Sequence, residues 1–119
     1  MDVDVLSWRE QQADGVSVLI LRGELDHWSG AGLELHLIGL TAAGHDRIVL
    51  DATELCFCDA GGLGILLRGL ARARAQQGWL RLAGADRRIR RLLTLVNLGG
   101  ALPVFDSVGD AVAGRPSAR

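Results

Sequence analysis

The chain has 119 residues, of which 49% are hydrophobic and 23% charged, and its formal net charge is −1. This length suits one domain around one hydrophobic core, and the balanced charge argues against direct binding to nucleic acid or to an anionic membrane surface. The first residues lack a signal-peptide pattern and no apolar run approaches the roughly 20 residues of a membrane span, so we expect a cytoplasmic protein with no membrane-inserted segment.

The first half of the chain is typical of two strands, a helix and a third strand. Strands are predicted over residues 5–12 and 16–21, and a turn signal at residues 13–15 joins them. Leucines repeat at helical spacing within residues 29–43, and a short apolar strand follows over residues 47–52. The chain therefore opens with an antiparallel hairpin.

The second half of the chain alternates helices and strands. The predicted elements are a helix over 60–77 that ends at Gly78, a strand over Trp79–Ala83, a helix over 87–98, a strand over 102–105 and a helix over Val108–Ala113. The order ββαβαβαβα implies a small α/β sandwich, with a mostly parallel sheet, one antiparallel edge strand and helices packed on it. We expect one domain with its core over residues 3–113 and a frayed tail over 114–119.

The carboxyl ends of the parallel strands are the expected place for a binding site, because loops converge there in open α/β sheets. Three segments are predicted as loops at this edge, namely 23–28, 53–59 and 84–86. Trp28 stands just before the first predicted helix. Its indole is either an exposed interface anchor or a cover for the sheet edge.

The second helix is predicted to begin at the sequence Asp-Ala-Gly-Gly, residues 59–62. Asp59 is well placed as the N-cap, because its carboxylate accepts free N–H groups of the first turn and offsets the helix dipole. Gly61 and Gly62 each cost about 0.8 to 1.0 kcal/mol relative to alanine in a helix interior, and less in a first turn. Such a cost suggests that an anion or another chain approaches this helix start closely.

No catalytic or metal-binding pattern stands out. No nucleophile has an evident base, and the three histidines lack partners at metal-ligand spacing. Residues 62–67 lack the third glycine of a dinucleotide fingerprint, and without lysine there is no P-loop.

Cys56 and Cys58 are expected to be free, partly buried thiols. The arginines at 87, 88, 90 and 91 indicate either the solvated face of an amphipathic helix or a patch for an acidic partner. We therefore expect a non-enzymatic binding protein with no metal or cofactor.

A set of short stretches, taken in order, resembles a known family. They are Gly-Glu-Leu-Asp at 23–26, Ile-Val-Leu-Asp at 48–51, Phe-Cys-Asp-Ala-Gly-Gly-Leu-Gly at 57–64, Leu-Arg-Leu at 80–82 and Arg-Arg-Leu-Leu at 90–93. The set is similar to the STAS domain family, in particular to bacterial anti-sigma factor antagonists. The resemblance covers nearly the whole chain.

The resemblance implies a role in partner switching. Such proteins bind an anti-sigma factor, often a serine kinase with a GHKL-type ATP site, and so release a sigma factor to RNA polymerase. The kinase phosphorylates a serine at the first position of the second helix, and the added charge of about −1.5 to −2 ends the binding. The partner-binding residues implied for this sequence are Asp26, His27, Trp28, Thr53, Asp59, Ala60, Gly61 and Gly62.

The sequence departs from this family pattern at the phosphoacceptor position. Ala60 stands where the serine is expected, and Gly61 takes the second serine position. Three interpretations follow: a constitutive antagonist, an antagonist switched elsewhere with Thr53 or Ser29 as the modified residue, or an interaction subunit of a transport or stress-sensing assembly. Nucleotide or phosphate binding at the open helix start is a further alternative.

Overall fold

Five strands form one sheet in the order β1-β2-β3-β4-β5 in the computed structural model, which describes residues 5–96 and 100–115. β1 (Ser7–Ala13) and β2 (Val16–Leu25) pair antiparallel, whereas β2, β3 (Arg47–Cys58), β4 (Trp79–Ala83) and β5 (Val104–Phe105) pair parallel. The predicted mostly parallel sheet with an antiparallel edge strand is confirmed. The parts of the predictions that fall on 3–4, 97–98 and 116–119 lie outside the described residues.

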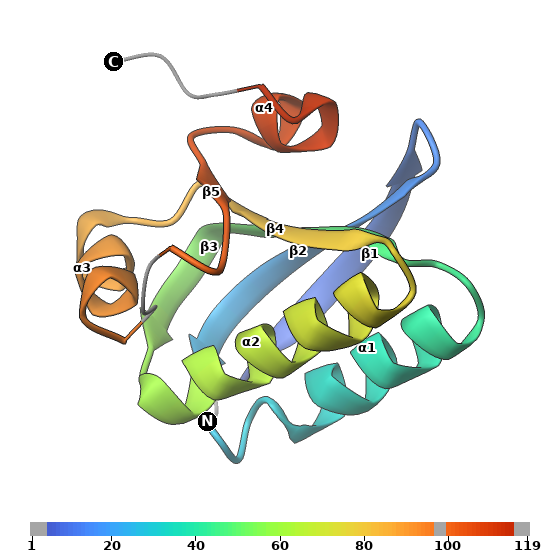
Figure 1. Cartoon of the computed structure of the whole chain (residues 1–119). Helices are drawn as coiled ribbons and strands as arrows, with labels where there is room; N and C mark the ends of the chain where they lie inside the picture. The colour runs from blue at the N-terminus through green and yellow to red at the C-terminus, as the bar shows by residue number, and fades with distance from the viewer. Residues whose placement is uncertain (1–4, 97–99, 116–119) are drawn as a thin grey trace.

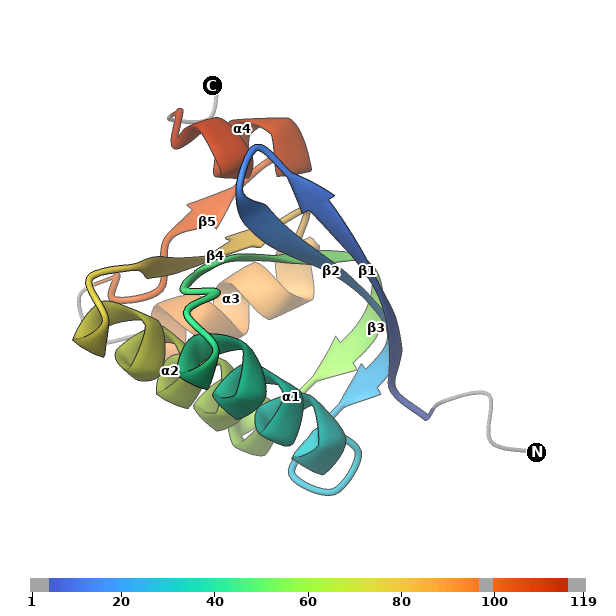
Figure 2. The ribbon, with the colours of Figure 1, turned by 90° about the vertical axis from the view of Figure 1, so that its right-hand side faces the viewer.

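Four helices complete the predicted order of elements. They are α1 (Ala31–Ala42), α2 (Ala60–Ala75), α3 (Arg87–Val96) and α4 (Val108–Ala113). α1 and α2 lie side by side beneath the sheet, and α4 lies on its opposite face (Figures 1 and 2). The α/β sandwich predicted from the sequence is therefore the observed architecture.

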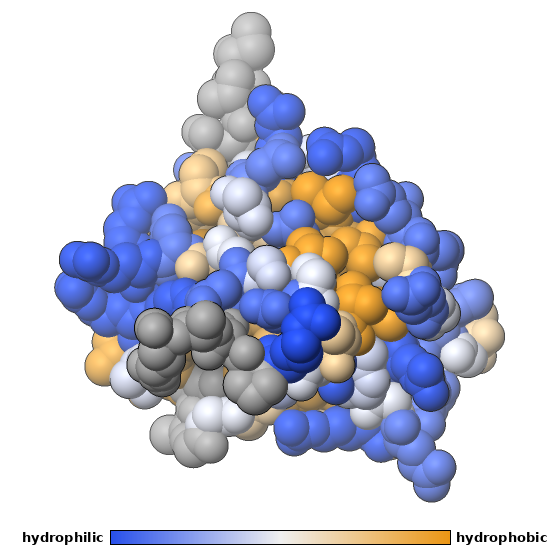
Figure 3. All heavy atoms as spheres, turned by 90° about the horizontal axis from the view of Figure 1, so that it is seen from above, coloured by the Kyte–Doolittle hydropathy of each residue, from blue (hydrophilic) through white to orange (hydrophobic). Residues whose placement is uncertain are grey.

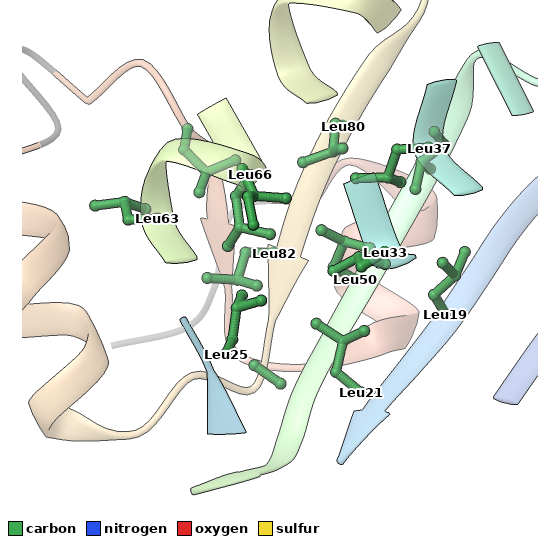
Figure 4. Packing of buried hydrophobic residues seen from close by; sticks show 14 of the residues in the cluster. Leu19, Leu21, Leu25, Leu33, Leu37, Leu50, Leu63, Leu66, Leu80 and Leu82 are labelled. Atoms are coloured by element: carbon green, nitrogen blue, oxygen red, sulfur yellow. The ribbon is translucent and has the colours of Figure 1, made fainter. Parts of the chain in front are cut away.

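Leucines dominate the larger of two hydrophobic clusters, which fills the space between the sheet and α1 and α2 (Figure 4). Each fully buried leucine stabilises the fold by about 1.5 to 3 kcal/mol. A smaller cluster lies on the other face, where α4 covers part of the sheet, and apolar atoms show in the middle of that face in Figure 3. Its buried members are Val16, Val18, Ile20, Val49, Ala83 and Ala111. Both faces of the central strands are thus apolar, as parallel strands require.

Two strands are longer than the sequence predicted. β2 continues to Leu25 and β3 to Cys58, so residues 23–25 and 53–58 are strand and the loop prediction was wrong there. The β2–β3 pairing shifts register between Ile20 and Arg22 and again between Gly23 and Glu24. Such irregularities break the alternation of apolar and polar residues by which a strand is recognised.

Two helix ends also differ from their predicted positions. α1 begins at Ala31 rather than at Ser29, because the Ser29 side chain belongs to the preceding turn. α2 ends at Ala75, and Gln77 rather than Gly78 takes the left-handed conformation, with φ of 67°. Gly78 is required for another reason, since a Cβ there would overlap the backbone of Asp46.

Candidate functional site

A tight turn between β2 and α1 positions the tryptophan singled out above. The Asp26 carboxylate accepts hydrogen bonds from the N–H groups of Trp28 (2.9 Å) and Ser29 (2.7 Å). The Ser29 hydroxyl accepts from the N–H of Asp26 and donates to the carbonyl of Glu24 (2.7 Å). The hydrogen bond from the Ser29 N–H holds the pKa of Asp26 below its ordinary value of 3.8. These interlocked bonds fix the backbone that carries Trp28.

The indole of Trp28 points into solvent. Its exposed fraction is 85%, the highest among the exposed large hydrophobic residues of the described chain. The ring of His27 packs edge-on against it, with 5.2 Å between the ring centroids. Trp28 therefore does not cover the sheet edge, and an exposed aromatic side chain on a fixed turn has the character of an interface anchor.

The start of α2 is capped as the sequence predicted. The Asp59 carboxylate accepts a hydrogen bond from the N–H of Gly62 at 2.8 Å, and the Asp59 carbonyl accepts one from the N–H of Leu63. Ala60 and Gly61 are exposed, whereas Gly62 is buried. The helix start thus presents two small residues to solvent directly after its cap.

Close packing brings the α2 start against the turn that carries Trp28. A Cβ at Gly62 would overlap the carbonyl of Leu25, and a Cβ at Gly61 would lie 3.2 Å from the Cβ of His27. The glycines therefore allow α2 to approach the end of β2 within this chain, which is a different use from the approach of an outside partner that the sequence suggested. Seven of the eight predicted partner-binding residues share this corner. They are Asp26, His27, Trp28, Asp59, Ala60, Gly61 and the buried Gly62.

Thr53 is not part of this corner. It lies on β3, about 16 Å of extended strand before Cys58. Its hydroxyl donates a hydrogen bond to the Asp51 carboxylate at 2.6 Å, and it stands against Gly84, where a Cβ would overlap it. The structure therefore separates Thr53 from the other predicted site residues.

The two cysteines have different surroundings. Cys58 is partly buried, and burial, reinforced by the charge of Asp59, raises the pKa of its thiol to about 12. Cys56 is exposed, with its Sγ 3.2 Å from the carbonyl oxygen of Gly23. Both are free thiols, as predicted, but only Cys58 is partly buried. Among residues 5–96 and 100–115, no three Cys, His, Asp or Glu side chains are grouped to hold a metal ion.

Comparison with known proteins identifies the family. A family model described as "Mlab, STAS domain" matches residues 8–105. The chain belongs to the STAS domain family. Within the described part of this STAS domain, no helix is long and apolar enough to cross a membrane.

The relatives of this STAS domain include anti-sigma factor antagonists. It is 26% identical over 99 residues to an anti-sigma F factor antagonist of Paenibacillus polymyxa, a match that covers 82% of this chain and 85% of the relative. The crystal structure of an anti-sigma factor antagonist from Mycobacterium paratuberculosis is 25% identical, with a TM-score of 0.81 and coverage of 93% and 94%. A sulfate transporter family protein from Wolinella succinogenes shares the fold at 21% identity, with a TM-score of 0.69 and coverage of 87% of each chain. The chain is thus an anti-sigma factor antagonist-like STAS domain.

Sequence reasoning missed the interlocked turn that holds Trp28. The sequence pattern that indicates this turn is Asp-x-x-Ser over residues 26–29. At this spacing the side chain of each residue can accept a hydrogen bond from the backbone N–H of the other. The turn and the helix start form one surface, residues 26–28 with 59–61, which we call the docking surface.

Proposed function

We propose that this STAS domain binds an anti-sigma factor, a serine kinase of the GHKL type, through the docking surface and thereby frees a sigma factor for RNA polymerase. The observation that carries the proposal is the exposed Trp28 beside a capped helix start whose first residues are small. The relative from Paenibacillus polymyxa, an anti-sigma F factor antagonist, supports the choice of partner. In this proposal the protein acts by binding the anti-sigma factor, and the residues of the docking surface make contacts rather than carry out catalysis.

Trp28 is the expected anchor of the complex. Tryptophan is enriched among interface residues whose truncation costs about 2 kcal/mol or more. The backbone that carries the indole is already held by the turn, because Asp26 fixes the N–H groups of Trp28 and Ser29. Little backbone conformational freedom is therefore lost on binding, which favours affinity. The small side chains at Ala60 and Gly61 let a partner reach the first turn of α2.

Binding at this site is proposed to be constitutive. Ala60, at the expected phosphoacceptor position, has no hydroxyl. The two nearest alternative acceptors are engaged: the Ser29 hydroxyl bonds within its turn, and the Thr53 hydroxyl donates to Asp51. A phosphate on Thr53 would also face the Asp51 carboxylate, and like charges repel at that distance. The local structure thus supports the first of the three interpretations.

A binding assay against the GHKL-type kinases of the same genome tests the proposal. We expect one of them to bind the native chain and Trp28→Ala to weaken that complex at least about tenfold, since 1.4 kcal/mol is a factor of ten. Ile38→Ala is the matched control, because it also truncates an exposed apolar side chain, 38% exposed, that lies about two helical turns into α1 and outside the docking surface. Failure of every kinase to bind, with a transporter subunit recovered as the native partner, would replace the proposal by the transport-assembly alternative.

A further inference from the structure

The outer side of α3 carries an unusual density of positive charge. Four of the 13 basic residues of the chain lie within its first five positions, at 87, 88, 90 and 91. Two of them meet carboxylates: Arg88 approaches Asp86 at 3.8 Å and Arg90 pairs with Asp106 at 2.9 Å. In the part of the chain that the structure describes, no carboxylate lies within ion-pair distance of Arg87 or Arg91.

This arrangement is unfavourable for the helix itself. Arg87 and Arg91 are four positions apart, so their like charges face each other along one side of α3. Arg87 is the first residue of α3, where the positive end of the helix dipole disfavours cations. The first turn of α3 contains no acidic residue. Asp86, the N-cap, accepts a hydrogen bond from the N–H of Ile89 at 2.9 Å, and its negative charge offsets part of the positive charge at this helix end. An arrangement that weakens its own helix is explained if an anionic group from outside completes it.

The unpaired arginines border a hollow that also offers an apolar contact. An open depression of about 350 Å³ is lined by Arg87, Arg90, Arg91, Thr94 and Leu95. We call these five residues the arginine face. Leu95 is 71% exposed, while the buried Ile89 and Leu93 attach the opposite side of α3 to the core. α3 lies at the left edge of the molecule in Figure 1.

We propose that the arginine face binds an acidic segment of a partner protein, with carboxylates paired to Arg87 and Arg91 and an apolar side chain against Leu95. Guanidinium groups form bidentate pairs with carboxylates, and the combination of charge and exposed leucine suits a peptide. The charged stretch spans little more than one helical turn, and no aromatic side chain lines the hollow on which a base could stack. A nucleic acid therefore fits it less well. This inference does not rest on the proposed function, because the arginine face is separate from the docking surface.

Fluorescence anisotropy with a labelled acidic peptide tests the inference. The probe is a short peptide in which glutamates four positions apart flank a leucine, titrated with the full chain at low ionic strength. We expect saturable binding that Arg87→Glu/Arg91→Glu weakens about tenfold or more, since two charge pairs are reversed. The matched control is Arg22→Glu/Arg47→Glu, which changes the net charge equally at two exposed strand positions outside the arginine face.

The folding of the double variant is measured alongside. The midpoint of thermal unfolding of Arg87→Glu/Arg91→Glu is expected to equal or exceed that of the native chain, because glutamates near the start of α3 favour the helix dipole. A native chain that does not bind the peptide, or a control variant that loses as much affinity, would overturn the inference. So would equal or tighter binding of a single-stranded DNA oligonucleotide or of phosphatidylglycerol vesicles, which would assign the face to nucleic acid or to membrane.

Discussion

Asp26 ties the stability of the Trp28 turn to pH. Its pKa is held below 3.8 in the folded chain, chiefly by the hydrogen bond from the Ser29 N–H. A carboxylate with a lowered folded pKa stabilises the fold above its unfolded pKa, and this contribution is lost as the pH falls through the folded value. Thermal unfolding of the native chain and of Asp26→Asn, measured from pH 7 to pH 2, should show a native advantage that is constant above about pH 5 and shrinks below 3.8. An advantage that stays constant to the acid end would contradict the role of the Asp26 charge.

The two cysteines should differ in reactivity. The thiolate is the reactive form, and burial raises the pKa of the Cys58 thiol to about 12, so this thiol stays protonated at pH 8. Cys56 is exposed and accessible to reagent. Brief treatment of the folded chain with iodoacetamide, followed by peptide mass mapping, should therefore find the label on Cys56. Equal labelling of Cys58, with unfolded chain as the control for full reactivity, would show that the end of β3 is more open than described.

Two glycines in helices should respond in opposite ways to alanine, which tests the element packing. A Cβ at Gly39, in α1, would meet nothing within 4 Å, so Gly39→Ala should stabilise the chain by about 0.5 to 1 kcal/mol. A Cβ at Gly62, in α2, would overlap the Leu25 carbonyl, so Gly62→Ala should destabilise it by about 1 to 3 kcal/mol. Urea unfolding of both variants measures the two signs. A destabilising Gly39→Ala would mean that the outer side of α1 is covered in solution.

Elements whose apolar residues recur at a regular helical or strand spacing were predictable from the sequence. Elements in which this spacing is interrupted were not. The leucines of α1 and α2 repeat at helical spacing because they fill one core, and the cap at Asp59 follows from its side chain alone. The second half of β3 lacks a local strand pattern, because Thr53 and Glu54 are both exposed beside a register shift and the alternation of apolar and polar residues is broken there. Pairing with β2, a contact distant in sequence, makes that segment a strand, and a local pattern does not contain this information.

At the scale of the whole molecule, the topology explains which part of the site the sequence could locate. Parallel strands bring their carboxyl ends to one edge, so the meeting of residues 26–28 with 59–61 followed from the element order. The position of Thr53 did not follow, because it depends on where β3 ends. The exposure of Trp28 depends on bonds between Asp26 and Ser29, which require the folded turn.

The central claim is that the docking surface binds a GHKL-type kinase and that phosphorylation at residue 60 does not end this binding. Titration calorimetry of the kinase with the native chain and with Ala60→Ser, before and after incubation with ATP and Mg²⁺, tests it most directly, with mass spectrometry of each product. We expect the native chain to remain unmodified with unchanged affinity, and Ala60→Ser to gain a phosphate and lose affinity at least about tenfold, because a doubly charged group then lies within the interface. A native chain that takes up phosphate and loses its affinity would contradict the account.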